Sequence, residues 1–198
     1  MKKTVLLPLI ALALAALLLL GASVGLNGIA AANAQAEHLQ IMQTLLPGST
    51  AFTVEPYTGE DANIRSVHKA ENGFVIETAT NGYAGEIVML IGVSNEGRVT
   101  GLVVREMQET FGLGSNALTD HEFLAQFLNT TGDVSIATSG ADAFSSATAA
   151  SSDTSGSTDV DAITGATVTS KAVARCVNSA VAYVTGADAE SGATSWGG

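Results

Sequence analysis

A long apolar run near the start of the chain limits what the remainder can become. Lys2 and Lys3 are followed by no charged residue before Glu37, and Val5–Val24 consists almost entirely of Leu, Ala, Val and Ile. About 20 apolar residues in a helix, at roughly 1.5 Å each, cross a bilayer core of roughly 30 Å. The run therefore predicts a transmembrane anchor within residues 1–34, with all later residues on one side of the membrane.

The charges that flank this run predict its orientation. Lysines beside a membrane span stay cytoplasmic, so Lys2 and Lys3 place the N-terminal tip in the cytoplasm and the main domain outside. A cleaved secretory signal is the alternative, because residues 32–34 (Ala-Asn-Ala) resemble a small-residue cleavage site. Secretory signals have a shorter apolar region of about 7–15 residues, which favours a retained single-pass anchor in the cell membrane.

Composition excludes several classes of function. The formal net charge is −11, so no basic surface exists to neutralise nucleic-acid phosphates, and we expect no nucleic-acid partner. A single cysteine, Cys176, excludes an intrachain disulfide and an iron–sulfur cluster held by this chain's thiolates alone. Three histidines dispersed along the sequence argue against a metal site. With 198 residues, the chain has room for one modest domain beside the anchor.

The sequence after the anchor changes from a helical to a strand pattern. Residues 35–46 carry apolar side chains at helical spacing and are followed by Pro47-Gly48, which predicts a juxtamembrane segment over 35–50. Period-two alternation then predicts short strands, at Phe52–Val54, Ile64–Val67 and Phe74–Thr78.

A hairpin is the strongest strand signal. Glu86–Val93 and Arg98–Val104 flank the turn residues Asn95–Gly97. The first of these strands is apolar at nearly every position, so it should lie inside the sheet rather than at an edge. The pattern predicts an α+β fold, in which a single N-terminal transmembrane helix precedes an extracytoplasmic domain with a mostly antiparallel sheet and packed helices.

The C-terminal half alternates between helical and low-complexity sequence. Thr119–Glu122 has the spacing of a capping box, and it begins a short helix whose apolar face is Phe123, Leu124, Phe127 and Leu128. Residues 130–158 are mostly Ser, Thr, Ala, Gly and Asp, which predicts a surface loop. An apolar stripe predicts a helix up to Val184, ended by Gly186, with Cys176 as a core side chain. The main domain would thus span 51–186, with a tail at 187–198.

One stretch, Asp161–Lys171, carries a chemical signal. A Gly-Ala turn presents the hydroxyl residue Thr167 where the C-terminal helix should start. Helix N-termini bind anions, because their first N–H groups have no intrahelical partner and the helix dipole is positive there. The stretch therefore predicts a phosphate site at Thr167. The alternative is an ordinary helix cap, a role that Thr often fills.

The same residues resemble a known motif. Asp161, Thr164, Gly165, Ala166 and Thr167 match Asp-x-x-(Ser/Thr)-Gly-Ala-(Ser/Thr), the flavinylation motif of the FMN-binding domain family, which includes the G subunit of Rnf complexes. Two further stretches are similar to that family's landmarks. One is Gly82–Gly85, and the other is Glu109–Gly114, where Phe111 replaces the family's usual proline.

The resemblance implies where a cofactor would sit. The last hydroxyl residue of the motif, Thr167, would carry FMN covalently through a phosphoester installed by a flavin transferase. The other residues that the resemblance places at the cofactor are Asp161, Thr164, Gly165, Ala166, Thr169, Glu109, Thr110, Gly112, Leu113 and Gly114. A second motif copy occurs at Asp188–Thr194. Thr167 precedes an amphipathic helix that can supply N–H groups and a dipole to a phosphate, whereas Thr194 precedes only Ser-Trp-Gly-Gly. Thr167 is therefore the expected acceptor, and the second copy is a decoy or, as the alternative, a second acceptor.

The resemblance also implies a function. An Rnf-type complex transfers electrons from reduced ferredoxin to NAD and couples this to Na⁺ or H⁺ transport. The chain would be its flavin-carrying electron-transfer subunit without a catalytic site of its own. Its partners would be the other membrane subunits, including a second flavin subunit and iron–sulfur subunits. Two alternatives stay open, namely a covalent-flavin subunit of another extracytoplasmic electron-transfer chain, and a non-redox, membrane-anchored interaction module.

Overall fold

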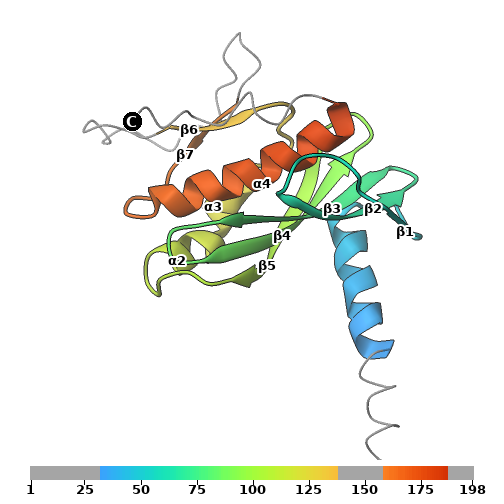
Figure 1. The fold of residues 1–198 in the computed structure, drawn as a ribbon, viewed down its shortest axis with the longest axis horizontal. Coiled ribbons are helices and arrows are strands. Elements are labelled where there is room, and N and C mark those ends of the chain that lie inside the picture. The colour runs from blue at the N-terminus through green and yellow to red at the C-terminus, as the bar shows by residue number, and fades with distance from the viewer. Residues whose placement is uncertain (1–31, 138–157, 187–198) are drawn as a thin grey trace, which may run out of the picture. The chain divides into compact units, whose positions relative to one another are not determined.

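A five-stranded antiparallel sheet forms the centre of the domain. The computed structural model describes residues 32–137 and 158–186 (Figure 1). The strands follow one another in the order β1-β2-β3-β4-β5, each beside its neighbour in sequence. Their bounds are β1 Thr53–Glu55, β2 Ile64–Ala70, β3 Gly73–Asn81, β4 Glu86–Ser94 and β5 Val99–Met107. The structure confirms the predicted strands and the mostly antiparallel sheet.

The β4–β5 hairpin forms where the sequence predicts it. Gly97 N–H donates to Ser94 C=O at 2.9 Å, and Gly97 has φ +76°, a left-handed conformation that glycine adopts without strain. β4 lies between β3 and β5, and all its residues except the two ends are buried. A strand can be apolar at every position only when both faces of its sheet are covered. The interior place predicted for this strand is confirmed.

The long helix α4 (Thr167–Thr185) covers one face of the sheet, across β3 and β4 (Figure 1). It ends at Gly186, which has φ +69° and donates its N–H to Ala182 C=O, as the sequence predicts. Its apolar side packs into the main core, where the largest fully buried side chains are Phe127, Ile76, Ile87, Met89, Ile91, Val67, Val93, Val99 and Val160.

Residues 42–46 contact the strand pair β4–β5 through two glycines. Residues 32–45 are helical, and Met42, Leu45 and Leu46 are buried outside the main core. Gly92 pairs with Gly101 across the two strands, and a Cβ on Gly92 would lie 2.3 Å from Leu45 C=O oxygen. Thr100 Oγ1 donates to the same oxygen at 2.6 Å. The missing side chains let a backbone segment approach the sheet.

Cys176 is a core side chain, as the sequence predicts. It is fully buried on α4, and burial raises the pKa of its thiol from 9.0 to about 11, against a smaller lowering effect of the Thr78 hydroxyl. A buried thiol with a raised pKa is a poor nucleophile, so a packing role is favoured over a reactive one.

The raised pKa of Cys176 predicts a loss of stability at alkaline pH. The unfolded chain releases the thiol proton near pH 9, whereas the folded chain retains it to about pH 11. The contribution of the buried thiol to the free energy of unfolding is therefore complete below pH 9. Between pH 9 and pH 11 it falls by about 1.4 kcal/mol per pH unit. Chemical denaturation of the parent and of Cys176→Ala at pH 8, 9, 10 and 11 measures this difference. Parallel pH profiles of the two proteins would contradict it.

The capping residue of the short helix α3 (His121–Ala125) differs from the predicted one. Asp120 is the N-cap, and its Oδ1 accepts from Glu122 N–H at 2.9 Å and Phe123 N–H at 3.2 Å. Thr119 is instead the last residue of α2 (Gly114–Thr119), an element that the sequence pattern did not indicate. Its Oγ1 donates to Ser115 C=O within its own helix, and Asp120 accepts from the first N–H groups of the next one. The capping box predicted at Thr119–Glu122 is wrong by one residue.

This cap gives a testable difference between adjacent residues. Asp120→Ala should lower the free energy of unfolding by about 1 kcal/mol, because two N–H groups lose their acceptor. Thr119→Ala should cost less than about 0.5 kcal/mol, because an exposed hydroxyl bonded to its own helix contributes little. Guanidinium denaturation of both variants measures this difference in the free energy of unfolding. An equal loss of stability in the two variants would indicate that Thr119 caps the helix.

Two strands lie outside the main sheet and correct the prediction of a loop over 130–158. β6 (Val134–Ala137) pairs in parallel with β7 (Thr158–Asp161). Asn178 of α4 satisfies both backbone groups of Val134, at 2.8 and 3.0 Å. Val134 and Asn178 are 44 residues apart in the chain, so the composition around Val134 does not reveal the strand. Residues 138–157, the rest of that loop, lie outside the described residues.

The transmembrane prediction concerns residues that the structure does not describe. Within 32–137 and 158–186, no helix combines the length and apolar character that a membrane span requires. The apolar run at Val5–Val24 and the second motif copy at 188–194 both lie outside these ranges, so the anchor, the tail and the domain boundaries stay predictions.

Candidate functional site

The motif that the sequence singles out forms a turn between β7 and α4. Ala166 N–H donates to Ile163 C=O at 2.9 Å, and Gly165 between them has φ +81°. A residue with a side chain would be strained there, so the turn requires glycine. Ser170 Oγ then joins the turn to the helix, because it accepts from Ile163 N–H and donates to Ala166 C=O. The turn is thereby fixed on the first turn of α4.

The first residue of α4 is Thr167, and the helix has no side-chain cap. Ala166 occupies the N-cap position and makes no side-chain hydrogen bond, and the first intrahelical bond runs from Ser170 N–H to Ala166 C=O at 2.8 Å. Thr167 is half-buried, whereas Thr169 is only 1% exposed. The alternative that Thr167 is merely the cap therefore does not hold. An uncapped helix start with a reachable hydroxyl fits a phosphate.

The second predicted segment, Glu109–Gly114, is the loop after β5 together with the first residue of α2. Leu113 N–H donates to Thr110 C=O, and Gly112 N–H donates to Ser115 Oγ at 3.1 Å. Gly112 has φ +88° with nothing near a Cβ added there, so backbone conformation alone requires this glycine. The loop exposes apolar groups, since Phe111 is 95% exposed.

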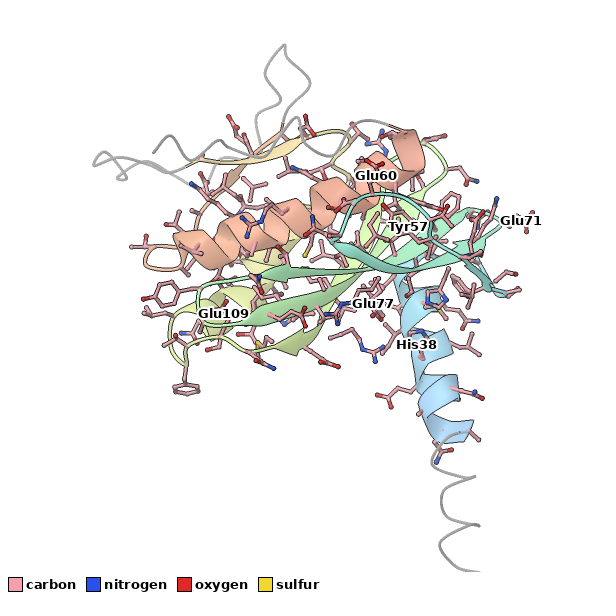
Figure 2. All side chains as sticks on the ribbon, viewed as in Figure 1. His38, Tyr57, Glu60, Glu71, Glu77 and Glu109 are labelled. Carbon is pink, nitrogen blue, oxygen red and sulfur yellow. The ribbon has the colours of Figure 1, made fainter. Side chains whose placement is uncertain are left out.

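The fold brings this loop against the motif. A Cβ built on Gly165 would lie 3.4 Å from Leu113 Cδ2. A Cβ built on Gly114 would lie 2.8 Å from Thr169 Oγ1 and 2.5 Å from Glu109 Oε2. Glu109 lies at the end of the sheet that faces the start of α4 (Figure 2). Two segments about 50 residues apart in sequence thus form one site, and glycines allow their close contact.

Three other predicted residues have exposed side chains. Asp161 and Thr164 are exposed, and the Asp161 backbone N–H donates to Gln126 Oε1 at 3.0 Å. Thr110 contributes its carbonyl to the loop, while its side chain is exposed. Sequence reasoning missed Ser170 and Gln126 as supports of the motif. The hydroxyl of Ser170, beside Thr169, was a weak signal, and Gln126 gave none.

A separate hollow of about 420 Å³ lies away from these residues. It is lined by Ala62, Asn63, Ala79, Thr80, Asn81, Glu86 and Arg175. Its charged groups already have partners, because Arg175 donates to Asn81 C=O at 2.8 Å and Glu86 pairs with Arg65. None of the residues predicted for the cofactor lines it, so the site at the start of α4 is the better candidate.

Comparison with protein families matches residues 82–182 to the FMN-binding domain. The chain belongs to the FMN-binding domain family. The matched range begins at Gly82 and contains the Glu109–Gly114 loop, the motif and most of α4. The resemblance inferred from the sequence is therefore confirmed.

Relatives of the chain are the G subunits of redox complexes. It is 33% identical to that of the ion-translocating oxidoreductase complex of Methanosarcina acetivorans, over 73% of each chain. It is 35% identical to that of the proton-translocating ferredoxin:NAD(+) oxidoreductase complex of Clostridium ljungdahlii, over 57% of this chain and 53% of the relative. For the Na(+)-translocating complex of Acetobacterium woodii, the identity is 34%, and 55% of this chain and 47% of the relative are matched. The matched region thus spans about half the length of the Clostridium ljungdahlii and Acetobacterium woodii subunits.

Proposed function

We propose that this chain is the flavin-carrying electron-transfer subunit of a membrane-bound, ion-translocating oxidoreductase of the Rnf type. Membership in the FMN-binding domain family and the names of its relatives support this proposal. The observation that carries it is the uncapped start of α4 at Thr167, where the neighbouring Gly165 and Thr169 lie against the 109–114 loop.

FMN is proposed to be held covalently, by a phosphoester to Thr167. The phosphate would be balanced by the free N–H groups and the dipole of the first turn of α4. The Glu109–Gly114 loop, through Thr110, Gly112, Leu113 and Gly114, would border the ring, with Asp161, Thr164, Gly165, Ala166 and Thr169 around the attachment. Bound FMN would supply one- and two-electron transfer.

The residues of the chain bind and orient this group rather than act on a substrate. Backbone donors of the loop and the dipole of α4 would favour negative charge at the site, and reduction adds such charge. A covalent link also retains the cofactor outside the cytoplasm, where a dissociated one would be lost. We therefore expect no separate substrate site on this subunit.

The assembly follows from the same proposal. The anchor at residues 1–34 would hold the domain on the outer face of the membrane, next to a second flavin subunit and iron–sulfur subunits. A flavin transferase would install the FMN. Electrons from reduced ferredoxin would pass toward NAD with Na⁺ or H⁺ transport by the whole complex. A covalent-flavin subunit of another extracytoplasmic chain is the alternative for the partners, since the same site would serve it.

Detection of covalently bound flavin on the chain tests the proposal directly. The full chain is expressed with and without a flavin transferase, and washed membranes are separated on a denaturing gel. Acid-stable flavin fluorescence on this band, dependent on the transferase, is the expected result. A fluorescent band in membranes also supports the anchor. A band without flavin under both conditions would leave only the non-redox interaction module.

A further inference from the structure

The carboxylate of Glu109 lies between two glycines that belong to different loops. A Cβ on Gly82 would lie 1.8 Å from Glu109 Oε1, and a Cβ on Gly114 would lie 2.5 Å from Oε2. Side chains at either position would displace the carboxylate, since real Cβ atoms do not approach an oxygen so closely. The two glycines therefore define a slot that Glu109 fills.

One oxygen of this carboxylate joins two loops. Glu109 Oε1 accepts from Tyr83 N–H at 2.7 Å, a bond between residues 26 positions apart. It ties the β3–β4 loop, which Gly82 N–H closes on Gly85 C=O at 2.8 Å, to the end of β5. A hydrogen bond to a charged acceptor is stronger than one between neutral groups. Glu109 thus fixes the position of the loop that carries the exposed Tyr83.

The other oxygen faces the first turn of α4. Oε2 is buried and has no hydrogen-bond partner among the residues that the structure describes. The point that a Cβ of Gly114 would occupy is 2.5 Å from this oxygen and 2.8 Å from Thr169 Oγ1, so both groups lie close to the backbone of Gly114. A buried carboxylate oxygen without a donor is unfavourable by a few kcal/mol. A donor supplied by a bound ligand would remove this cost.

We propose that Glu109 is the positioning residue of the flavin site. It holds the 82–85 loop against the end of β5 through the bond from Tyr83 N–H, and its Oε2, on the side of the first turn of α4, accepts from an N–H or O–H donor of the bound flavin. This inference rests on the proposed function. It assigns Glu109 a role that differs from that of its loop neighbours, which border the cofactor through backbone and apolar groups.

The position also predicts an electrostatic effect. A carboxylate near the flavin opposes the negative charge that reduction adds, so it lowers the midpoint potential. Glu109→Gln removes the charge but retains an oxygen that can accept from Tyr83 N–H. Glu106→Gln is the matched control, because Glu106 is exposed near the end of β5, three residues before Glu109, and carries the same charge.

The experiment uses the full chain, co-expressed with its flavin transferase, with two measurements. Hydrogen–deuterium exchange follows the Tyr83 amide, and a redox titration gives the midpoint potential of the bound flavin. We expect Glu109→Ala to lose most of the protection of the Tyr83 amide and Glu109→Gln to retain it. The flavin potential should rise in Glu109→Gln and stay near the parent value in Glu106→Gln.

The outcomes separate this inference from the proposed function. Unchanged Tyr83 protection in Glu109→Ala, or equal potentials in Glu109→Gln and Glu106→Gln, would overturn the positioning role. If the parent chain never acquires flavin, the proposed function fails. The exchange measurement on the flavin-free chain then still decides whether Glu109 holds the two loops together.

Discussion

Thr167→Ala should abolish covalent flavin while the domain stays folded. The hydroxyl at position 167 is the proposed attachment atom, and it stands on the first residue of α4. Removing one half-buried hydroxyl on the surface should change the free energy of unfolding by less than about 0.5 kcal/mol. Denaturing gels read by flavin fluorescence, together with circular dichroism of the same samples, measure both quantities. Fluorescence should fall to the level of a chain expressed without the transferase.

Thr194→Ala is the control for this result. Thr194 ends the second motif copy, at 188–194, and we expect its variant to keep full flavin fluorescence. Peptide mass spectrometry of the parent should find the FMN adduct on the peptide that contains Thr167. An adduct on Thr194 alone, with Thr167→Ala still fluorescent, would move the attachment to the tail and refute the proposal for α4.

Gly92→Val should destabilise the domain by about 3 kcal/mol, the upper part of the range for overpacking. A Cβ at position 92 would lie 2.3 Å from the backbone oxygen of Leu45, and the branched side chain adds two more carbons there. Backbone cannot move aside as a flexible side chain can, so residues 42–46 would leave the sheet. Guanidinium denaturation followed by circular dichroism gives the loss of stability.

Thr100→Val tests the same contact by a gentler change. It keeps the shape of the side chain and removes only the donor to Leu45 C=O, so the expected loss is about 1 kcal/mol. If residues 42–46 contact the sheet, the two losses should not add in the double variant, because both act on one backbone oxygen. A Gly92→Val chain as stable as the parent would contradict this contact.

The predicted strands agree well with the observed ones because their signals are local. The apolar run Glu86–Val93 and the strand Arg98–Val104, with turn residues between them, are signals that depend only on neighbouring positions, and β4 and β5 form there. The same holds for α4, whose apolar spacing and terminal Gly186 can be read within 20 residues. β6 is different, since Asn178 and β7 stabilise it from far along the chain, and the local composition indicates a loop.

In the candidate site, too, some features could be predicted from local sequence and others only from the packing. Local sequence was enough to predict the turn, the start of α4 and the family, because turn chemistry and motif spacing are short-range properties, whereas the acceptor role of Thr167 stays a prediction. Packing was needed to establish that Ala166 is the N-cap, that Leu113 meets Gly165, and that Glu109 lies between Gly82 and Gly114. The last two contacts join residues that are far apart in sequence. Their geometry depends on how the sheet and α4 pack, which no local pattern encodes.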